Sequence, residues 1–167
     1  MLPHLDAAYR FARWLCRSPA DADDIVQEAF LRAFRAFDSL RGEDVKAWLL
    51  AIVRNCNATA LQQQQRRTAL AVAQDRLGED HTAASPDPES VTAAAEERGT
   101  LVRLIAALPA EHREVLLLRE MEDMSYREIA AVIDVPIGTV MSRLARARGA
   151  LRGKWLEQAA GGPRAVR

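Results

Sequence analysis

The chain has 167 residues and a mass of 18.5 kDa, enough for one compact domain or two small ones. Its 49% hydrophobic and 28% charged residues are typical of a soluble globular protein, and no run approaches the roughly 18 uninterrupted apolar residues of a membrane-spanning helix. The 23 basic and 23 acidic residues cancel, which disfavours a protein that coats nucleic acid through bulk positive charge. With two cysteines and three scattered histidines, we expect no metal site, no cofactor and a reducing cytoplasmic setting.

The zero total charge conceals segments of different charge. Residues 1–68 carry 10 basic and 8 acidic residues, and residues 103–167 carry 11 and 8. Between them, residues 69–102 hold 2 basic and 7 acidic residues, and prolines with small polar residues fill 81–90. We therefore expect an all-α fold of two small helical domains joined by an acidic flexible linker. The expected boundaries are 1–68 and 101–160 for the domains, 69–100 for the linker and 161–167 for a tail.

Three amphipathic helices are predicted in the first domain. The first has an apolar face at three-and-four spacing formed by Leu5, Ala8, Tyr9, Ala12, Leu15 and Cys16. A second helix begins at Ser18, Pro19 and Asp21, because serine caps, proline suits the first turn and the acid completes a capping-box-like spacing. Its predicted buried stripe is Ile25, Val26, Ala29, Phe30, Ala33, Phe34 and Phe37. In a third helix, the residues predicted to face inward are Val45, Trp48, Leu49, Ile52, Val53 and Cys56. This helix is predicted to continue into a polar, solvent-facing segment at 62–67.

The second domain is predicted to begin with two helices on either side of Pro109, since the residue before a proline avoids helical geometry. The earlier helix, from about residue 101, carries Leu101, Leu104, Ile105 and Leu108. The later one carries the apolar residues Val115, Leu116, Leu118 and Met121.

A helix-turn-helix is predicted between Ser125 and Leu151. Ser125 and Glu128 form a capping box, so that a helix begins at Tyr126 and buries Ile129, Ala130, Val132 and Ile133. A turn at 134–136 follows, because aspartate tolerates left-handed geometry and proline cannot lie within a helix. The second helix starts near Ile137 and buries Val140, Leu144, Ala147 and Leu151.

Polar and basic residues face outward from this second helix. Thr139, Ser142, Arg143 and Arg146 lie opposite the apolar stripe, with Arg148 flanking it. Arginine presents a planar donor fork that matches guanine edges and phosphate oxygens. The pattern therefore indicates a DNA-reading helix, with an ordinary solvated basic helix as the alternative interpretation.

Three segments together resemble the bacterial sigma factors. The segment 23–34 is similar to their polymerase-core-binding helix, 48–55 to their promoter-melting helix, and 108–116 with 125–151 to their fourth region. These matches occur in the expected order across the acidic linker and cover roughly 120 residues. Because an N-terminal extension and a third region are missing, the resemblance points to the extracytoplasmic-function (ECF) group.

The resemblance implies a sigma factor that binds core RNA polymerase, directs it to promoter DNA and is controlled by an anti-sigma factor, with no membrane insertion. Docking on the clamp helices of the largest polymerase subunit is assigned to Asp24, Gln27, Glu28 and Arg32. Contacts to the minus-ten element are assigned to Arg41, Lys46, Arg54, Asn55 and Asn57, while core packing is favoured for Trp48. Minus-thirty-five contacts are assigned to Thr139, Ser142, Arg143, Arg146 and Arg148. Loss of Arg143 is expected to cost about 1–3 kcal/mol of promoter binding.

Three positions depart from the family pattern. Met141 stands where many members carry a lysine, so that a phosphate contact is lost. Asp134 replaces the common turn glycine and places an acid near DNA. Thr59 stands where an aspartate often follows the motif asparagine.

Two other classes of protein account for parts of the sequence less completely than a sigma factor does. An autonomous helix-turn-helix repressor or activator accounts for 125–151 but leaves the N-terminal motifs unexplained, and such proteins usually dimerise on a palindrome. An enzyme is disfavoured because the sequence has no phosphate-binding glycine loop and no nucleophile elbow. Asp24 and Glu28 lie one turn apart, but two carboxylates alone define no metal site and no reaction.

Overall fold

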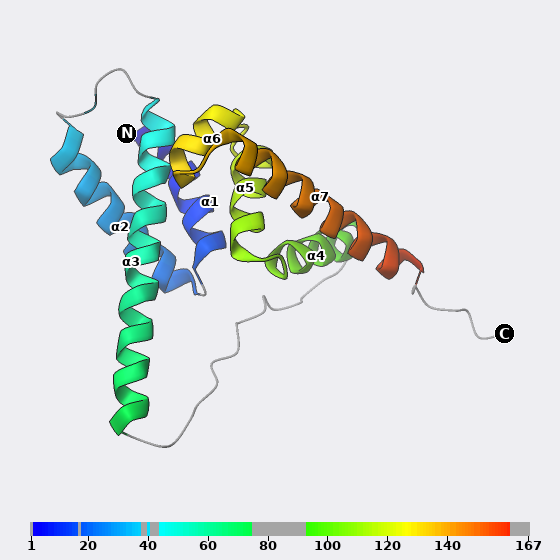
Figure 1. Ribbon diagram of the computed structural model, residues 1–167, viewed down its shortest axis with the longest axis horizontal. Coiled ribbons are helices and arrows are strands. Elements are labelled where there is room, and N and C mark those ends of the chain that lie inside the picture. Colours follow the sequence, from blue (N-terminus) through cyan, green and yellow to red (C-terminus); the bar gives the residue numbers. More distant parts are fainter. Residues whose placement is uncertain (1, 17, 38–39, 41–43, 75–92, 161–167) are drawn as a thin grey trace. The chain divides into compact units, whose positions relative to one another are not determined.

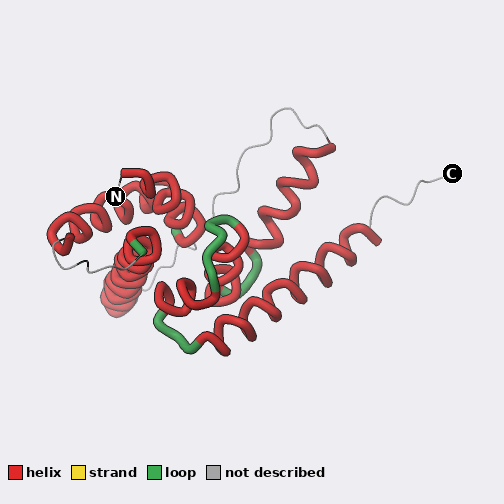
Figure 2. Tube along the Cα trace, turned by 90° about the horizontal axis from the view of Figure 1, so that it is seen from above, coloured by secondary structure: helices red, strands yellow, loops and turns green. Residues whose placement is uncertain are grey.

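The computed structural model describes residues 2–16, 18–37, 40, 44–74 and 93–160. Within these ranges every regular element is a helix, as Figure 2 shows, so the predicted all-α class is confirmed. The chain divides into two compact units, and the main boundary along the sequence falls within the segment predicted to be a linker. No helix in the described part of the chain combines the length and the hydropathy that a membrane span requires.

The first unit is built from three helices that pack against one another in all three pairings (Figure 1). A short 3-10 helix, η1 (Leu2–His4), leads into α1 (Leu5–Leu15), which is followed by α2 (Pro19–Ala36) and α3 (Val45–Gln74). The buried core residues are Ala7, Ala8, Phe11, Ala12, Ala22, Ile25, Val26, Ala29, Ala33, Ala47, Leu49, Leu50, Val53 and Cys56. The many alanines let the three backbones approach closely.

The buried faces of α1 and α2 differ in part from the predicted ones. Leu5 and Tyr9 are exposed, whereas Phe11 is buried beside Ala8 and Ala12. In α2, Phe34 is 77% exposed although the spacing placed it in the buried stripe, and Phe37, which directly follows the helix, is exposed as well. Both helices carry apolar residues on more than one face, so spacing alone does not identify the face that meets the neighbouring helices.

The predicted start of α2 is confirmed, and α3 is longer than the predicted domain. The Asp21 backbone N–H donates to Ser18 Oγ at 3.1 Å, with Pro19 in the first turn. Residues 61–69 of α3 are exposed on every side, as predicted for the polar segment. The helix continues to Gln74 because its last residues are rich in alanine and other helix formers.

The second unit contains α4 (Ala93–Ala106), α5 (Ala110–Glu120), α7 (Ile137–Ala160) and the part of α6 (Tyr126–Ile133) up to Ala130. Both α4 and α5 pack on α7. The buried apolar residues of these four helices and their loops are Leu104, Leu108, Val115, Leu116, Leu117, Leu118, Met124, Ile129, Val132, Ile133, Val140, Leu144 and Ala147.

Of two predicted helix boundaries in the second unit, one is confirmed and the other lies earlier in the chain than expected. The break before Pro109 is confirmed, and the Pro109 carbonyl accepts from the backbone N–H groups of His112 and Arg113 to start α5. Helix α4 begins earlier than predicted, since the run of alanines and glutamates from Ala93 favours helix. Thus α3 and α4 both enter the expected linker, and residues 75–92 between them lie outside the described ranges.

Candidate nucleic-acid and protein interfaces

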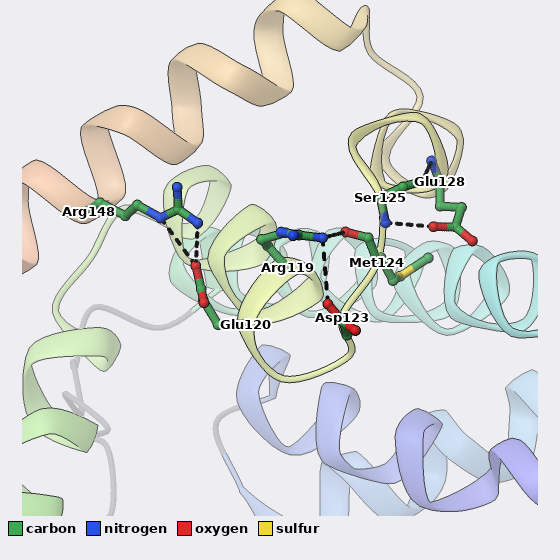
Figure 3. A network of polar contacts seen from close by, with 7 residues as sticks. All are labelled: Arg119, Glu120, Asp123, Met124, Ser125, Glu128 and Arg148. Atoms are coloured by element: carbon green, nitrogen blue, oxygen red, sulfur yellow. Dashed lines mark hydrogen bonds and ion pairs between the residues drawn. The ribbon is translucent and has the colours of Figure 1, made fainter.

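The capping box that starts α6 forms as predicted (Figure 3). The Ser125 backbone N–H donates to Glu128 Oε2 at 2.6 Å, and the Glu128 backbone N–H donates to Ser125 Oγ at 3.3 Å. These reciprocal bonds satisfy two amide groups that the first turn of a helix leaves without partners. They therefore define where the first helix of the helix-turn-helix begins.

Arg119, at the end of α5, holds the loop that leads to this start. Its Nη1 donates to the Met124 carbonyl at 2.7 Å and lies 3.7 Å from Asp123 Oδ1, as Figure 3 shows. Its guanidinium also stands 5.7 Å from the centre of the Tyr126 ring, within range of a cation–π interaction. One arginine thus links α5, the loop and the first residue of α6.

The turn between α6 and α7 has the predicted left-handed residue. Asp134 adopts a φ of 53°, a conformation that aspartate tolerates better than most side chains. The Val135 backbone N–H donates to the Ala130 carbonyl at 3.2 Å. The Pro136 carbonyl then accepts from the N–H groups of Thr139 and Val140 and begins α7.

The face of α7 opposite its buried stripe carries small and basic residues. The exposed residues there are Gly138, Ser142, Ala145, Arg146 and Gly149. A Cβ atom added at Gly138 or Gly149 would meet no atom within 4 Å, so packing within the unit does not require glycine at either position. Thr139 is half-buried, and its carbonyl accepts from Ser142 Oγ at 3.0 Å. Met141 is 53% exposed at the edge of this face.

The other two arginines predicted to contact DNA pair with carboxylates of α5. Arg143 Nη2 lies 3.0 Å from Glu111 Oε2, and the Arg143 side chain is only 22% exposed. Arg148 donates from Nε and Nη2 to Glu120 Oε1, at 3.2 and 2.6 Å (Figure 3), which raises the pKa of its guanidinium. The sequence does not indicate these pairs, because the partners lie far apart in the chain and no local pattern joins them.

The outer face of α2 combines the predicted polar residues with apolar ones. Asp24 and Gln27 are exposed, and the Glu28 Oε1 atom pairs with Arg32 Nε at 2.6 Å, which raises the pKa of Arg32. Leu31, which is 54% exposed, and Phe34 share the outer side of the helix with Gln27 by the i, i+4, i+7 spacing. We call Asp24, Gln27, Leu31 and Phe34 the α2 outer face. The exposure of its two apolar residues was not predicted. A signal for it exists in the sequence, because the alanines on the opposite side of α2 already suffice to fill the core side.

The residues assigned to the minus-ten element differ in their environments. Arg54 and Asn55 are neighbours in α3 and point about 100° apart around the helix. Asn55 is exposed, and its carbonyl accepts from Thr59 Oγ1 at 2.9 Å. Lys46 is half-buried near the start of α3, where the Asp44 carboxylate accepts from its backbone N–H. Arg41 lies outside the described residues.

Asn57 faces the side of the first unit where α1 ends. Its Oδ1 atom accepts a weak hydrogen bond from Cys16 Sγ at 3.6 Å, and burial raises the pKa of the Cys16 thiol to about 11. Both side chains line an open cavity of about 380 Å³ together with Asp21, Asp24 and Arg67. No group of three residues that could hold a metal ion occurs in the part of the chain that the structure describes.

Comparison with known proteins finds relatives for both units. Residues 2–67 match the family described as Sigma-70 region 2, and residues 98–151 match Sigma-70, region 4. The chain is 38% identical over 140 residues to the ECF RNA polymerase sigma-E factor of Escherichia coli (strain K12), covering 80% of this chain and 73% of that protein. It is 32% identical over 152 residues to the ECF RNA polymerase sigma factor SigE of Mycolicibacterium smegmatis, covering 89% and 57%.

A solved structure also resembles the chain over most of its length. It is the sigma factor RpoE in complex with the anti-sigma factor NepR, from Bartonella quintana. The TM-score is 0.71 and the sequence identity 29%, and the match covers 91% of both chains. The likeness therefore spans both units rather than the helix-turn-helix alone.

Proposed function

The chain belongs to the ECF RNA polymerase sigma factors, and from this premise we propose how its two units share the work of promoter recognition. As a sigma factor it binds core RNA polymerase and directs promoter-specific transcription initiation. The observation that carries this function is the presence of the region 2 and region 4 matches in one chain and in the family's order. A stand-alone repressor needs no region 2.

Core polymerase binding falls to α2 in this proposal. The exposed Asp24 and Gln27, with the Glu28–Arg32 pair beside them, give polar contacts that orient the partner. Leu31 and Phe34 add an apolar surface, and Phe34 is 77% exposed. Large apolar side chains that packing within the unit leaves uncovered are typical of protein interfaces.

Promoter DNA is divided between the two units. Contacts to the opened minus-ten element are assigned to the first unit, through Arg41, Lys46, Arg54, Asn55 and Asn57. The α7 face contacts the minus-thirty-five element in the major groove, as the second helix of a helix-turn-helix does. Thr139, Ser142 and Arg146 lie on that face, with Arg143 and Arg148 on its flanks. Seven basic residues and one acid between positions 136 and 167 favour an anionic partner.

Regulation by an anti-sigma factor is the third part of the proposal. The support is the likeness to a sigma factor that was crystallised with its anti-sigma factor. The protein acts in the cytoplasm, where the transcription machinery lies, and it has no catalytic activity of its own. The chemistry of RNA synthesis belongs to the polymerase.

The test is run-off transcription with sigma-free core polymerase. Added chain is expected to co-purify with core polymerase and to restore a discrete transcript from templates bearing its promoter. A chain that never associates with core polymerase contradicts the proposal. A tight, symmetric complex with operator DNA in the absence of polymerase would favour the autonomous repressor or activator instead.

A further inference from the structure

Two ion pairs tie α7 to opposite ends of α5. Glu111 lies in the first turn of α5 and pairs with Arg143, while Glu120 is the last residue of α5 and pairs with Arg148. The two arginines are five positions apart in the sequence, which places them about 140° apart around α7. They therefore flank the buried stripe of Val140, Leu144 and Ala147 on its two sides, and each reaches back toward α5.

In the Arg143–Glu111 pair the arginine is the packed partner, whereas the Glu111 side chain is 55% exposed. Only 22% of the Arg143 side chain is exposed, and its Nη2 lies 3.0 Å from Glu111 Oε2. The other carboxylate oxygen of Glu111 is 3.9 Å from His112 Nε2, on a side chain that is itself 15% exposed. To reach a phosphate, Arg143 would have to leave this packed position and separate from Glu111.

Arg146 has a different environment. It is exposed on the outer face of α7, one turn from the exposed Ser142. Gly138 and Gly149 on the same face have no side chains, so they do not keep a partner away from Ser142 and Arg146. Groups that read base edges need this access, whereas groups that fix the angle of a helix need a partner inside the unit.

We infer that Arg143 and Arg148 are positioning residues, held by Glu111 and Glu120, and that Ser142 and Arg146 make the direct contacts to the upstream promoter element. The inference rests on the proposed function and assigns roles within its minus-thirty-five face. A recognition helix must be held to within about 0.5 Å and 10–20° for its contacts to form. The two pairs set this angle from both sides, so their loss weakens all upstream contacts together.

The sign of the Glu111→Gln effect separates the two roles of Arg143. If Glu111 only competes with phosphate for Arg143, its neutralisation strengthens promoter binding. If Glu111 holds Arg143 in place, the same change weakens binding although it removes a negative charge. Asp134→Asn is the matched control, because it also removes one exposed negative charge beside α7 and asparagine keeps the left-handed turn.

The experiment uses full-length chain reconstituted with core polymerase. The probe is a promoter duplex that the wild-type holoenzyme selects from a pool randomised upstream of the start site. Glu111→Gln and Arg143→Ala are each expected to lower affinity about two- to fivefold, and the double variant no further, since exposed pairs contribute modestly and act as one unit. Asp134→Asn is expected to leave affinity unchanged or to raise it.

The salt dependence of promoter affinity separates a phosphate contact from a structural role, because losing a residue with a purely structural role leaves this dependence unchanged. Arg146→Ala is expected to lower promoter affinity at least about fivefold. It is also expected either to change the sequence preference of the holoenzyme, as for a base contact, or to reduce the slope of log Kd against log salt by about one, as for a phosphate contact. Arg143→Ala is expected to leave the slope and the sequence preference as in the wild type. Circular dichroism of each variant confirms folding, and the Glu111→Gln sign decides the matter if Arg143→Ala unfolds.

Tighter binding by Glu111→Gln, or a slope reduced by about one in Arg143→Ala, would overturn the inference and make Arg143 a phosphate contact. These outcomes leave the proposed function intact. A wild-type holoenzyme that retains no duplex from the pool would instead overturn the proposed function, and this inference with it.

Discussion

The outer faces of α2 and α7 are both left uncovered within their own units, but they differ in chemistry. The α2 outer face presents Leu31 and Phe34 among polar residues, whereas α7 presents glycine, serine and arginine. Large apolar side chains suit a protein partner, and a narrow basic face suits the groove of a nucleic acid. Two amphipathic helices of one chain thus acquire different partners through the residues opposite their buried stripes.

The strongest way to break this comparison is to remove the second unit alone. Leu144 is 2% exposed, so Leu144→Asp buries a charge without a partner and is expected to destabilise the unit by about 4 kcal/mol or more. Circular dichroism should show partial loss of helicity, and core polymerase binding through α2 should persist. Ala145→Asp, at an exposed neighbouring position, is the folding control. Full helicity in Leu144→Asp would contradict the burial on which the α7 assignment depends.

A second substitution tests the α2 face. Phe34→Ala is expected to weaken core polymerase binding by about 2 kcal/mol, the scale of an interface hot spot, without lowering the stability of the first unit. The affinity is measured with labelled chain and core polymerase. Leu61→Ala, which removes another exposed apolar side chain from the same unit, should have little effect. Equal losses in both variants would remove the distinction between α2 and the remaining surface.

Substitutions at the two helix caps test whether the two units lose stability separately. Ser18→Ala removes the cap of α2, and Ser125→Ala removes one half of the capping box of α6. Each is expected to cost about 1 kcal/mol. Thermal unfolding should place the first loss in the first unit and the second near the helix-turn-helix. Identical effects of both substitutions on every probe would indicate that the chain unfolds as a single cooperative unit.

The smallest expected effect is at the turn before α7. Asp134→Gly is expected to stabilise the helix-turn-helix by about 0.5–1 kcal/mol, because glycine relieves the positive φ but adds freedom to the unfolded chain. Denaturant unfolding measures the change, with Asp134→Asn as the control that keeps a side chain. A destabilised Asp134→Gly variant would show that the aspartate side chain makes a contact that outweighs the backbone strain.

Local signals in the sequence predicted the helix starts and the turn correctly. Ser18, Ser125 with Glu128, and Asp134 act through groups a few residues away, so their outcome depends little on the rest of the chain. Predictions that required a choice between helix faces were less reliable. Tyr9 and Phe34 were placed inward because the spacing allowed it, but the neighbouring helices pack against other faces.

The sequence by itself determined the all-helical class, the helix-turn-helix and the family, since these follow from periodicity, capping groups and motifs that short segments carry. Tertiary structure alone decided which outward arginines of α7 are held by α5 and which phenylalanine of α2 stays exposed. The physical reason is that ion pairs such as Arg143–Glu111, and the burial of a ring, depend on distances between helices that are remote in sequence.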